Sequence, residues 1–285
     1  MKQFLKIVFE LGKVRISLPV TLSALAGYVL FLGRIDAQGL FMAAGVFFMS
    51  CGSGALNHWQ ERRTDRLMPR TKSRPIPSGK ISSVQGFMIV VGYVSLGSLI
   101  LILTNPLISL ALAWATLFFY NLVYTPLKRV TAFAVIPGSM VGSIPPVIGW
   151  TAAGGGMFSE AILIVAAFFF IGQIPHFWLL LLLFGNQYKL AGLPSLTDIF
   201  SEVQIKRITF TWILTTIASA LLVLLFVITK PVLFLTLALY IIFLVAFLTR
   251  SVFGREKFKA LPAFHLLNFL YLFVMLFLVF EGLLR

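Results

Sequence analysis

Three oxygen-bearing side chains recur at every fourth residue at the end of one apolar segment. They are Asn57, Glu61 and Asp65, and in a helix this spacing places all three on one face. Carboxylate and amide oxygens are ligands of hard divalent cations, and protein-bound Mg²⁺ usually completes its shell with water and substrate phosphate. The spacing therefore predicts a metal site, with Mg²⁺ as the cofactor.

A run of basic residues begins beside these oxygens. Its members are Arg62, Arg63, Arg66, Arg70, Lys72 and Arg74. Guanidinium groups bind phosphate oxygens through paired hydrogen bonds, so a diphosphate held through the metal is the ligand that this pattern favours. The alternative is a solvated loop beside a membrane, with Glu–Arg pairs along the helix.

The elements that must position these residues are long apolar segments. Hydrophobic residues make up 59% of the 285 residues and charged residues only 11%, whereas a soluble domain carries about 25% charged residues. Nine segments are apolar, at about 16–33, 38–56, 84–104, 107–124, 133–152, 158–184, 208–228, 231–249 and 262–283. Segments of about 20 residues cross the hydrocarbon layer as helices, because lipid offers backbone groups no partner.

We therefore expect an all-α polytopic membrane protein with nine transmembrane helices, forming a single domain over residues 1–285. The loops 57–83 and 185–207 are expected to carry the active-site motifs. No soluble domain interrupts the bundle.

The distribution of charge predicts the orientation in the membrane. With nine spans, 20 of the 23 Lys and Arg residues fall on one side of the bilayer. Cytoplasmic loops carry such an excess, so the N-terminus is expected in the cytoplasm and the C-terminus outside, in the inner (plasma) membrane. The net charge of +14 then reports topology, and no nucleic acid is expected as a partner.

Polar residues also occur inside the sixth apolar segment. Gln173 and His176 lie on either side of Pro175. Polar side chains within a span usually face the bundle interior and mark functional sites, although a hydrogen-bonded helix contact is the plainer interpretation. Small residues such as Gly138 and Gly142 in the fifth segment favour close helix packing, or room for a flat ligand.

Several short motifs follow one another between about residues 14 and 200. They are Asn57–Asp65, Met68–Gly79, Tyr124–Arg129, Pro137–Gly138, Ile144–Trp150, Gln173–Phe177 and Tyr188–Pro194. Together they resemble the intramembrane UbiA-type prenyltransferases, and within that superfamily the protoheme IX farnesyltransferases, or haem O synthases. The resemblance implies the UbiA-type bundle and transfer of farnesyl from farnesyl diphosphate to a vinyl group of haem b.

The resemblance also implies partners and site residues. The implied partners are farnesyl diphosphate, haem b and the lipid bilayer, with haem A synthase or a terminal oxidase assembly as protein partners. Asn57, Glu61 and Asp65 are implied as metal ligands, and Tyr124 and Lys128 join them as catalytic residues. The implied substrate-binding residues are Arg66, Arg70, Lys72, Arg74, Arg129, Gln173, His176, Asn186, Gln187 and Tyr188.

Two positions depart from the pattern of that superfamily. Arg63 stands where the first motif usually has an acid, and Gln187 stands where an acid usually precedes the tyrosine of the second motif. A second metal would then depend on Asp198 or Glu202. The alternatives are weakened catalysis, a one-metal mechanism, or a paralogue with another acceptor, such as a quinone precursor or a chlorin.

Two functions of other classes fit the composition as well. A transporter suits nine helices with interior polar residues, but the charges gather at the membrane face and not at the midplane, where transporter sites usually lie. A catalytically silent protein that assists oxidase assembly is compatible with Gln187.

Overall fold

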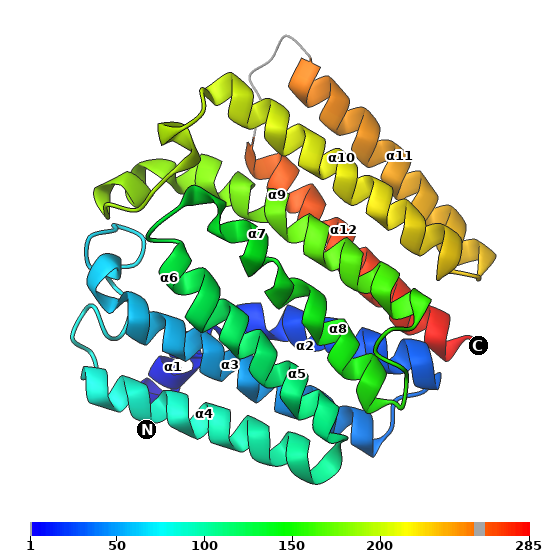
Figure 1. Ribbon diagram of the computed structural model, residues 1–285, viewed down its shortest axis with the longest axis horizontal. Helices are drawn as coiled ribbons and strands as arrows, with labels where there is room; N and C mark the ends of the chain where they lie inside the picture. The colour runs from blue at the N-terminus through cyan, green and yellow to red at the C-terminus, as the bar shows by residue number, and fades with distance from the viewer. Residues whose placement is uncertain (1, 254–259) are drawn as a thin grey trace.

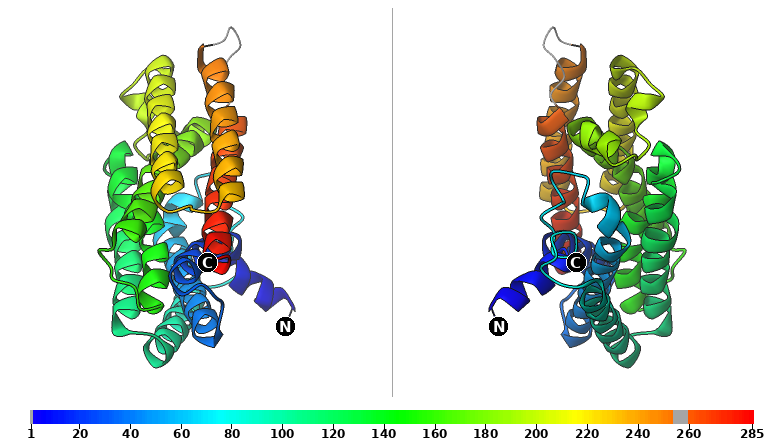
Figure 2. Two further views of the ribbon diagram at one scale, coloured as in Figure 1. Left: turned by 90° about the vertical axis from the view of Figure 1, so that its right-hand side faces the viewer. Right: turned by 90° about the vertical axis from the view of Figure 1, so that its left-hand side faces the viewer.

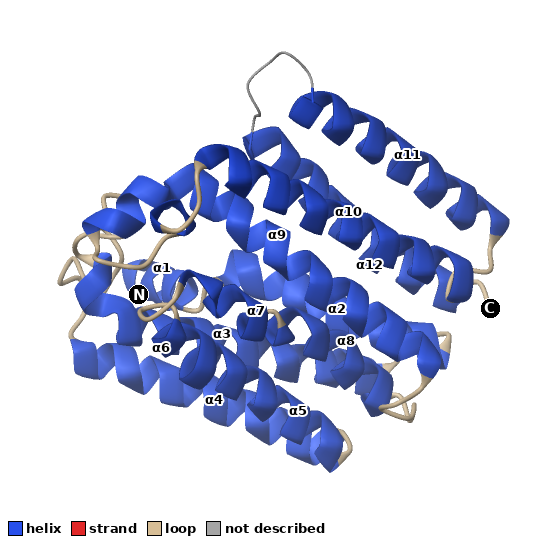
Figure 3. Ribbon diagram, turned by 45° about the horizontal axis from the view of Figure 1, so that its top comes forward, coloured by secondary structure: helices blue, strands red, loops and turns tan. Residues whose placement is uncertain are grey.

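The computed structural model describes residues 2–253 and 260–285 of the chain. Within these residues it is all-helical, without strands (Figure 3), and nine helices are long and apolar enough to cross a membrane. The prediction of an all-α polytopic membrane protein with nine spans is thereby confirmed. Arg255, Lys257 and Lys259, which contribute to the predicted charge asymmetry, lie outside the described residues.

The helices follow one another through short connections (Figure 1). Their bounds are α1 Lys2–Leu11, α2 Val14–Leu32, α3 Ala37–Asp65, α4 Ser83–Thr104, α5 Leu107–Leu117, the π-helix η1 Phe118–Tyr124, α6 Thr125–Leu127, the 3₁₀ turn η2 Ala132–Ala134, α7 Val135–Gly138, α8 Met140–Ala152, α9 Glu160–Leu190, the 3₁₀ turn η3 Leu196–Asp198, α10 Glu202–Phe226, α11 Pro231–Phe253 and α12 Ala260–Leu283. The fourth span combines α5, η1 and α6, and the fifth combines η2, α7 and α8.

The side chains at the helix ends explain several of these boundaries. The Asp36 carboxylate accepts a hydrogen bond from the Gly39 backbone N–H at 3.0 Å, which caps the start of α3. Ser82 and Gln85 form a reciprocal capping box at the start of α4. Such caps satisfy backbone N–H groups that the first helical turn leaves without partners.

Two apolar cores are the largest in the described part of the chain. One apolar core lies among α2, α3, α5 and α8, and a larger one lies among α9, α10, α11 and α12. The helix α2 contacts α3, α8 and α12, and α9 contacts both α8 and α12, so these helices join the two cores. In Figures 1 and 2, α4 and α11 lie at opposite margins of the assembly.

Close approach of α2 and α8 depends on glycine. A Cβ atom added at Gly27 would lie 2.0 Å from the carbonyl oxygen of Pro146, and one at Gly149 would lie 1.7 Å from that of Ala24. Apolar burial drives helix association weakly in lipid, and contact between backbones at small residues replaces it. The glycines therefore fix the crossing that supports the inner wall of the bundle.

Two helices run beyond their apolar segments. Residues 57–65 continue α3 and residues 186–190 continue α9, so these parts of the two motifs are helical and do not lie in loops. Both ends lie on the left-hand side of Figure 1, beside the chain that joins α3 to α4. Helical continuity explains why the side chains of the first motif keep a single face.

Candidate active site at one end of the bundle

The three side chains of the first motif face into the protein. Asn57, Glu61 and Asp65 on α3 are 2%, 6% and 0% exposed, although they lie at the polar end of the helix. Buried charges require partners, because removing an ion from water is costly. The site is therefore defined by the groups that contact these oxygens.

Each carboxylate is paired with a cation from another segment. The Arg74 guanidinium donates to both oxygens of Asp65, at 2.9 and 2.8 Å. The Lys128 ammonium, just after α6, forms an ion pair with Glu61. Among the described residues no three His, Cys, Asp or Glu side chains converge, so the Asn57 amide would have to serve as the third ligand of a metal held here.

Lys13 supplies the third cation. Its Nζ donates to Asn57 Oδ1 at 2.6 Å and lies 3.4 Å from the Tyr120 hydroxyl. The residue joins α1 to α2 with a positive φ of 47°, and this kink directs the chain back into the bundle. Burial and the nearby charge of Arg74 together lower the pKa of the Lys13 ammonium to about 7, although the Glu61 charge opposes the shift.

The second motif meets the chain that follows α3. The Gln187 side-chain oxygen accepts a hydrogen bond from the Arg70 backbone N–H at 3.2 Å. The Arg70 guanidinium lies over the Phe184 ring, 5.1 Å from its centre, and Lys128 Nζ lies 5.9 Å from the centre of the Tyr188 ring. The structure therefore brings together two motifs that are far apart in the sequence: Arg70 and Gln187 are separated by 117 residues.

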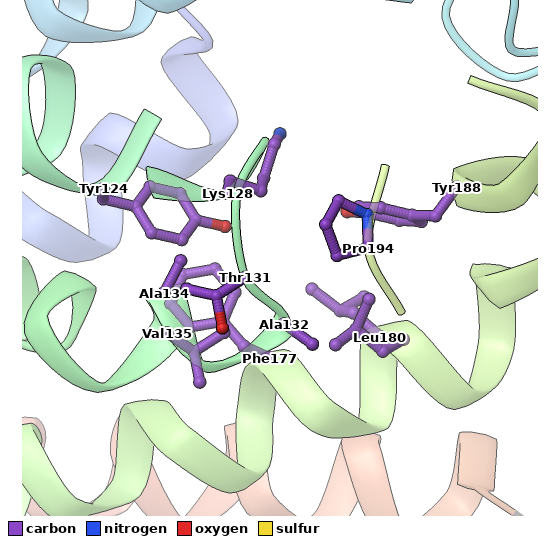
Figure 4. Close-up of a pocket in the computed structure, with 11 residues that line it drawn as sticks. Tyr124, Lys128, Thr131, Ala132, Ala134, Val135, Phe177, Leu180, Tyr188 and Pro194 are labelled. Carbon is purple, nitrogen blue, oxygen red and sulfur yellow. The ribbon is translucent and has the colours of Figure 1, made fainter. Parts of the chain in front are cut away.

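Aromatic rings lie beside the ion-pair cluster and line the neighbouring cavities. Tyr120 and Tyr124 on η1 stack with their ring centres 5.6 Å apart. A Cβ atom at Gly138 would lie 2.6 Å from the Tyr124 ring, so glycine is what leaves room for it. A small pocket of about 20 Å³ lies between Tyr124, Lys128 and Tyr188, which is enough space for about one water molecule. Figure 4 shows these side chains around it.

A much larger cavity of about 910 Å³ extends from Lys13 into the membrane-embedded part of the bundle. Its apolar wall includes Val46, Met49, Ala113, Leu117, Ile148 and Met275. Its polar groups include Tyr120, Gln173, His176, Asn268 and Tyr271. Typical ligand pockets measure about 300–1,000 Å³, so the cavity has room for a large apolar ligand.

Gly142 lies in the wall of this cavity, beside Gln173. A Cβ atom there would lie 2.6 Å from Gln173 Cγ, and both residues line the cavity. Of the two interpretations of the small residues in the fifth span, close helix packing is therefore the one that this position supports, because the glycine accommodates the Gln173 side chain of α9. At Gly138 the space is taken by Tyr124.

The remaining predicted residues lie around the mouth of the site. Arg66, Lys72 and Asn186 are exposed, as is Arg129, whose guanidinium donates to the Gln60 carbonyl oxygen at 2.9 Å. Asp198 is paired with Lys189 at 3.0 Å, and this hydrogen bond lowers the pKa of Asp198. The Glu202 side chain lies outside the described part of the chain. The substrate-binding roles of all these residues stay predictions.

Four residues of the site were not predicted from the sequence: Lys13, Tyr120, Asn268 and Tyr271. In the sequence, Lys13 is one of the 20 cations whose distribution predicts only the orientation in the membrane. Asn268 carried a usable signal, since an amide inside an apolar span usually faces the bundle interior. The tyrosines carried none, because membrane helices contain many aromatic residues.

Comparisons with known proteins place the fold and the motifs in one family. The model of the UbiA prenyltransferase family matches residues 19–280. The chain is 39% identical over 191 residues to a protoheme IX farnesyltransferase of Geobacter sulfurreducens, covering 66% of this chain and 69% of the relative. It is 34% identical over 190 residues to a protoheme IX farnesyltransferase of Oleidesulfovibrio alaskensis, with 67% of each chain covered.

Solved structures share the fold at low sequence identity. The structure from work on digeranylgeranylglyceryl phosphate synthase has a TM-score of 0.74 at 19% identity and covers 100% of both chains. A UbiA homologue from Archaeoglobus fulgidus, bound to GPP and Mg²⁺, has a TM-score of 0.69 at 15% identity and covers 96% of this chain and 99% of its own. These similarities bear on the helical arrangement alone.

Proposed function

The chain belongs to the UbiA prenyltransferase family, and on that premise we propose that it transfers a farnesyl group from farnesyl diphosphate to a vinyl group of protoheme IX (haem b), giving haem O. The observation that carries the proposal is the junction of two environments. A cluster of buried carboxylates and cations opens through Lys13 into an apolar cavity of about 910 Å³. The acceptor follows from the names of the two bacterial relatives.

The residues present fit a divalent cation. Asn57, Glu61 and Asp65 present oxygen atoms from one helix, and each of them binds a positively charged side chain in the structure. This face of α3 therefore already binds positively charged groups. We propose these three residues as the ligands of Mg²⁺, which would supply positive charge against the departing diphosphate.

The paired cations are the proposed diphosphate contacts. A metal bound to the carboxylates would displace Arg74 and Lys128 from the carboxylate oxygens and leave them nearby, so their N–H groups would become available to phosphate oxygens. Lys13 contacts Asn57 in a similar way, so we propose it as a third diphosphate contact. Arg70 and Arg129 are proposed to extend this binding at the mouth.

The reaction separates charge, and the chain can stabilise both parts. Cleavage of the allylic C–O bond leaves the electron pair on the diphosphate, where Arg74 and Lys128 compensate the charge. The vinyl π electrons of the acceptor form the new C–C bond, and water then adds a hydroxyl group with loss of a proton. The apolar wall and the Tyr120–Tyr124 stack limit premature access of water to the cation.

Topology and partners complete the proposal. The chain is a multi-span membrane protein, and we propose the bacterial inner membrane, with the N-terminus and the ion-pair cluster on the cytoplasmic side. The predicted contacts with haem A synthase or a terminal oxidase assembly stay predictions. Gln187 does not provide a charged ligand, so a single Mg²⁺ is the simplest composition.

The decisive experiment measures product. Purified protein is incubated with haem b, farnesyl diphosphate and Mg²⁺, and the pigments are analysed by mass spectrometry. Haem O formation that disappears with a chelator and falls in Asp65→Asn supports the proposal. If a quinone precursor or a chlorin is prenylated and haem b is not, the proposed acceptor is wrong and that molecule takes its place. Absence of product from every acceptor would favour a silent assembly protein.

A further inference from the structure

A buried polar network binds the π-helix η1 to α3. Ser53 Oγ donates to Asn121 Oδ1 at 2.6 Å, and Asn121 Nδ2 donates back to the Ser53 carbonyl oxygen at 3.0 Å. Gln60 Nε2 donates to the Asn121 carbonyl oxygen at 2.9 Å. In a π-helix that oxygen would accept from the residue five positions on, which is Pro126 and has no N–H. The Gln60 side chain of α3 therefore supplies the missing donor.

Asn57 contacts η1 and the ion-pair cluster with opposite ends of its amide. Its Nδ2 donates to Thr125 Oγ1 at 3.1 Å, just after η1, and its Oδ1 accepts from Lys13 Nζ at 2.6 Å. An ammonium group can only donate, so the atom that faces Lys13 must be the oxygen. Both contacts therefore require the same orientation of the amide, with its oxygen directed to the ion-pair cluster.

A backbone carbonyl decides what the Thr125 hydroxyl can do. Thr125 Oγ1 donates to the Tyr120 carbonyl oxygen at 2.8 Å, and the same oxygen accepts from the Thr125 backbone N–H. A hydroxyl carries one hydrogen, so toward Asn57 it presents only lone pairs and can only accept. Thr125 is 1% exposed, so bulk water does not take over this role.

The Thr125 contact gains importance when a metal binds. Mg²⁺ at Asn57 Oδ1 would displace the Lys13 ammonium from that oxygen, because two positive charges repel strongly at such short range. Within the described residues the Thr125 hydroxyl is the one hydrogen-bond acceptor of Nδ2, so it is then the contact that keeps the amide from turning. A turned amide would direct its N–H groups at the metal, and it would no longer be a ligand.

Packing of η1 against α3 does not by itself require a hydroxyl at position 125. The contacts of Asn121 with Ser53 and Gln60 already hold the two elements together. The Thr125 contact differs from them because it ends on a proposed metal ligand. Its removal should therefore change metal binding more than it changes folding.

We infer that Thr125 is a positioning residue of the metal site: its hydroxyl, directed by the Tyr120 carbonyl oxygen, holds the Asn57 amide with the oxygen toward Mg²⁺. This inference rests on the proposed function, since it takes Asn57 as a metal ligand. The π-helix that carries Tyr120 and Tyr124 then also sets the affinity for the metal. Loss of such a supporting contact usually weakens metal binding by about 10- to 100-fold.

The test measures metal binding without haem or a prenyl donor. The full-length protein in detergent is titrated with Mn²⁺, a spectroscopic substitute for Mg²⁺, alone and with inorganic diphosphate, and free Mn²⁺ is quantified by electron paramagnetic resonance. We expect Thr125→Val to raise the Kd for Mn²⁺ about 10- to 100-fold, and Thr125→Ser, which keeps the hydroxyl, to retain the wild-type Kd. Thr216→Val is the matched control, since Thr216 on α10 is 0% exposed and donates to the Trp212 carbonyl oxygen at 2.8 Å; its Kd should be unchanged.

A second background separates orientation of the amide from packing. Asn57→Asp keeps an oxygen ligand but gives it two equivalent oxygens, so turning the side chain no longer matters. In that background Thr125→Val should change the Kd by no more than about twofold, the usual limit for independent sites. Equal losses in both backgrounds would show that Thr125 acts through packing, and the inference would be wrong. If Thr125→Val does not fold, Thr125→Ala removes the same hydroxyl with fewer atoms, and the same comparison decides.

The possible outcomes distinguish this inference from the proposed function. An unchanged Kd in Thr125→Val overturns the inference and leaves the proposed metal ligands in place. The expected pattern of Kd values, in a protein that makes no haem O from haem b, supports the inference while the proposed acceptor is wrong. If the wild type binds no Mn²⁺ with or without inorganic diphosphate, both the metal site and the inference are wrong.

Discussion

The pairing of Arg74 with Asp65 predicts an unusual dependence of stability on Mg²⁺. Arg74 donates two hydrogen bonds to a carboxylate that is 0% exposed. The substitution Arg74→Gln removes the charge that compensates Asp65 in the metal-free protein. A metal ion bound by Asp65 would supply the missing charge, so the variant should need Mg²⁺ more than the wild type does.

The structure sets the size of the effect. Removing one partner of a buried ion pair costs about 3–5 kcal/mol, because the other charge stays buried and unpaired. At about 2 °C per kcal/mol for a chain of this size, the apparent melting temperature should fall by about 6–10 °C. Mg²⁺ at 100 times its Kd should stabilise the folded variant by about 2.7 kcal/mol, which corresponds to a rise of about 5 °C in its apparent melting temperature. In the wild type Mg²⁺ must displace Arg74 from Asp65, so its gain should be smaller.

The assay follows unfolding in detergent by intrinsic fluorescence, at one scan rate, because membrane proteins often unfold irreversibly. Arg62→Gln is the matched control, since its guanidinium lies over the Trp59 ring, 4.5 Å from the ring centre, on the same helix. The control should melt like the wild type. Equal Mg²⁺ shifts in Arg74→Gln and wild type would refute the competition between the arginine and the metal.

Three other substitutions test separate parts of the structure. Glu281→Gln removes the charge from a buried acceptor of two backbone N–H groups and should cost about 1–3 kcal/mol, seen as a lower melting temperature that Mg²⁺ does not restore. Gly142→Val should displace Gln173, narrow the cavity and raise KM for the acceptor several-fold, whereas Gly92→Ala, with open space around its Cβ, should leave KM unchanged. Lys13→Met should raise KM for farnesyl diphosphate about 10-fold or more, since a charged hydrogen bond contributes about 1.5–3 kcal/mol; unchanged kinetics would exclude Lys13 from the diphosphate site.

The position of Gln187 gives the departure from the superfamily pattern a structural context. Its side-chain oxygen accepts from the Arg70 backbone N–H, so the amide ties the end of α9 to the chain after α3. An amide in this role adds no charge beside Glu61 and Asp65. One metal with three side-chain ligands is therefore the composition that we propose.

The sequence alone determined the spans and the first face of the site. Hydropathy over about 20 residues is a local property, and helical spacing places Asn57, Glu61 and Asp65 together without reference to other segments. Their burial does not follow from the sequence, since the motif lies beyond its apolar run. The continuation of α3 to Asp65 gives the three side chains the predicted helical spacing and places this part of the motif in a helix and not in the expected loop.

Only the tertiary structure decided which partners these residues have. Lys13 reaches Asn57 across 44 residues, and Asn268 reaches His176 across 92. Membrane helices have similar hydropathy, so the pattern cannot specify which helices become neighbours; backbone contact at small residues does that. The π-helix that places Tyr120 and Tyr124 side by side likewise depends on packing, because no residue type in it requires the extra residue per turn.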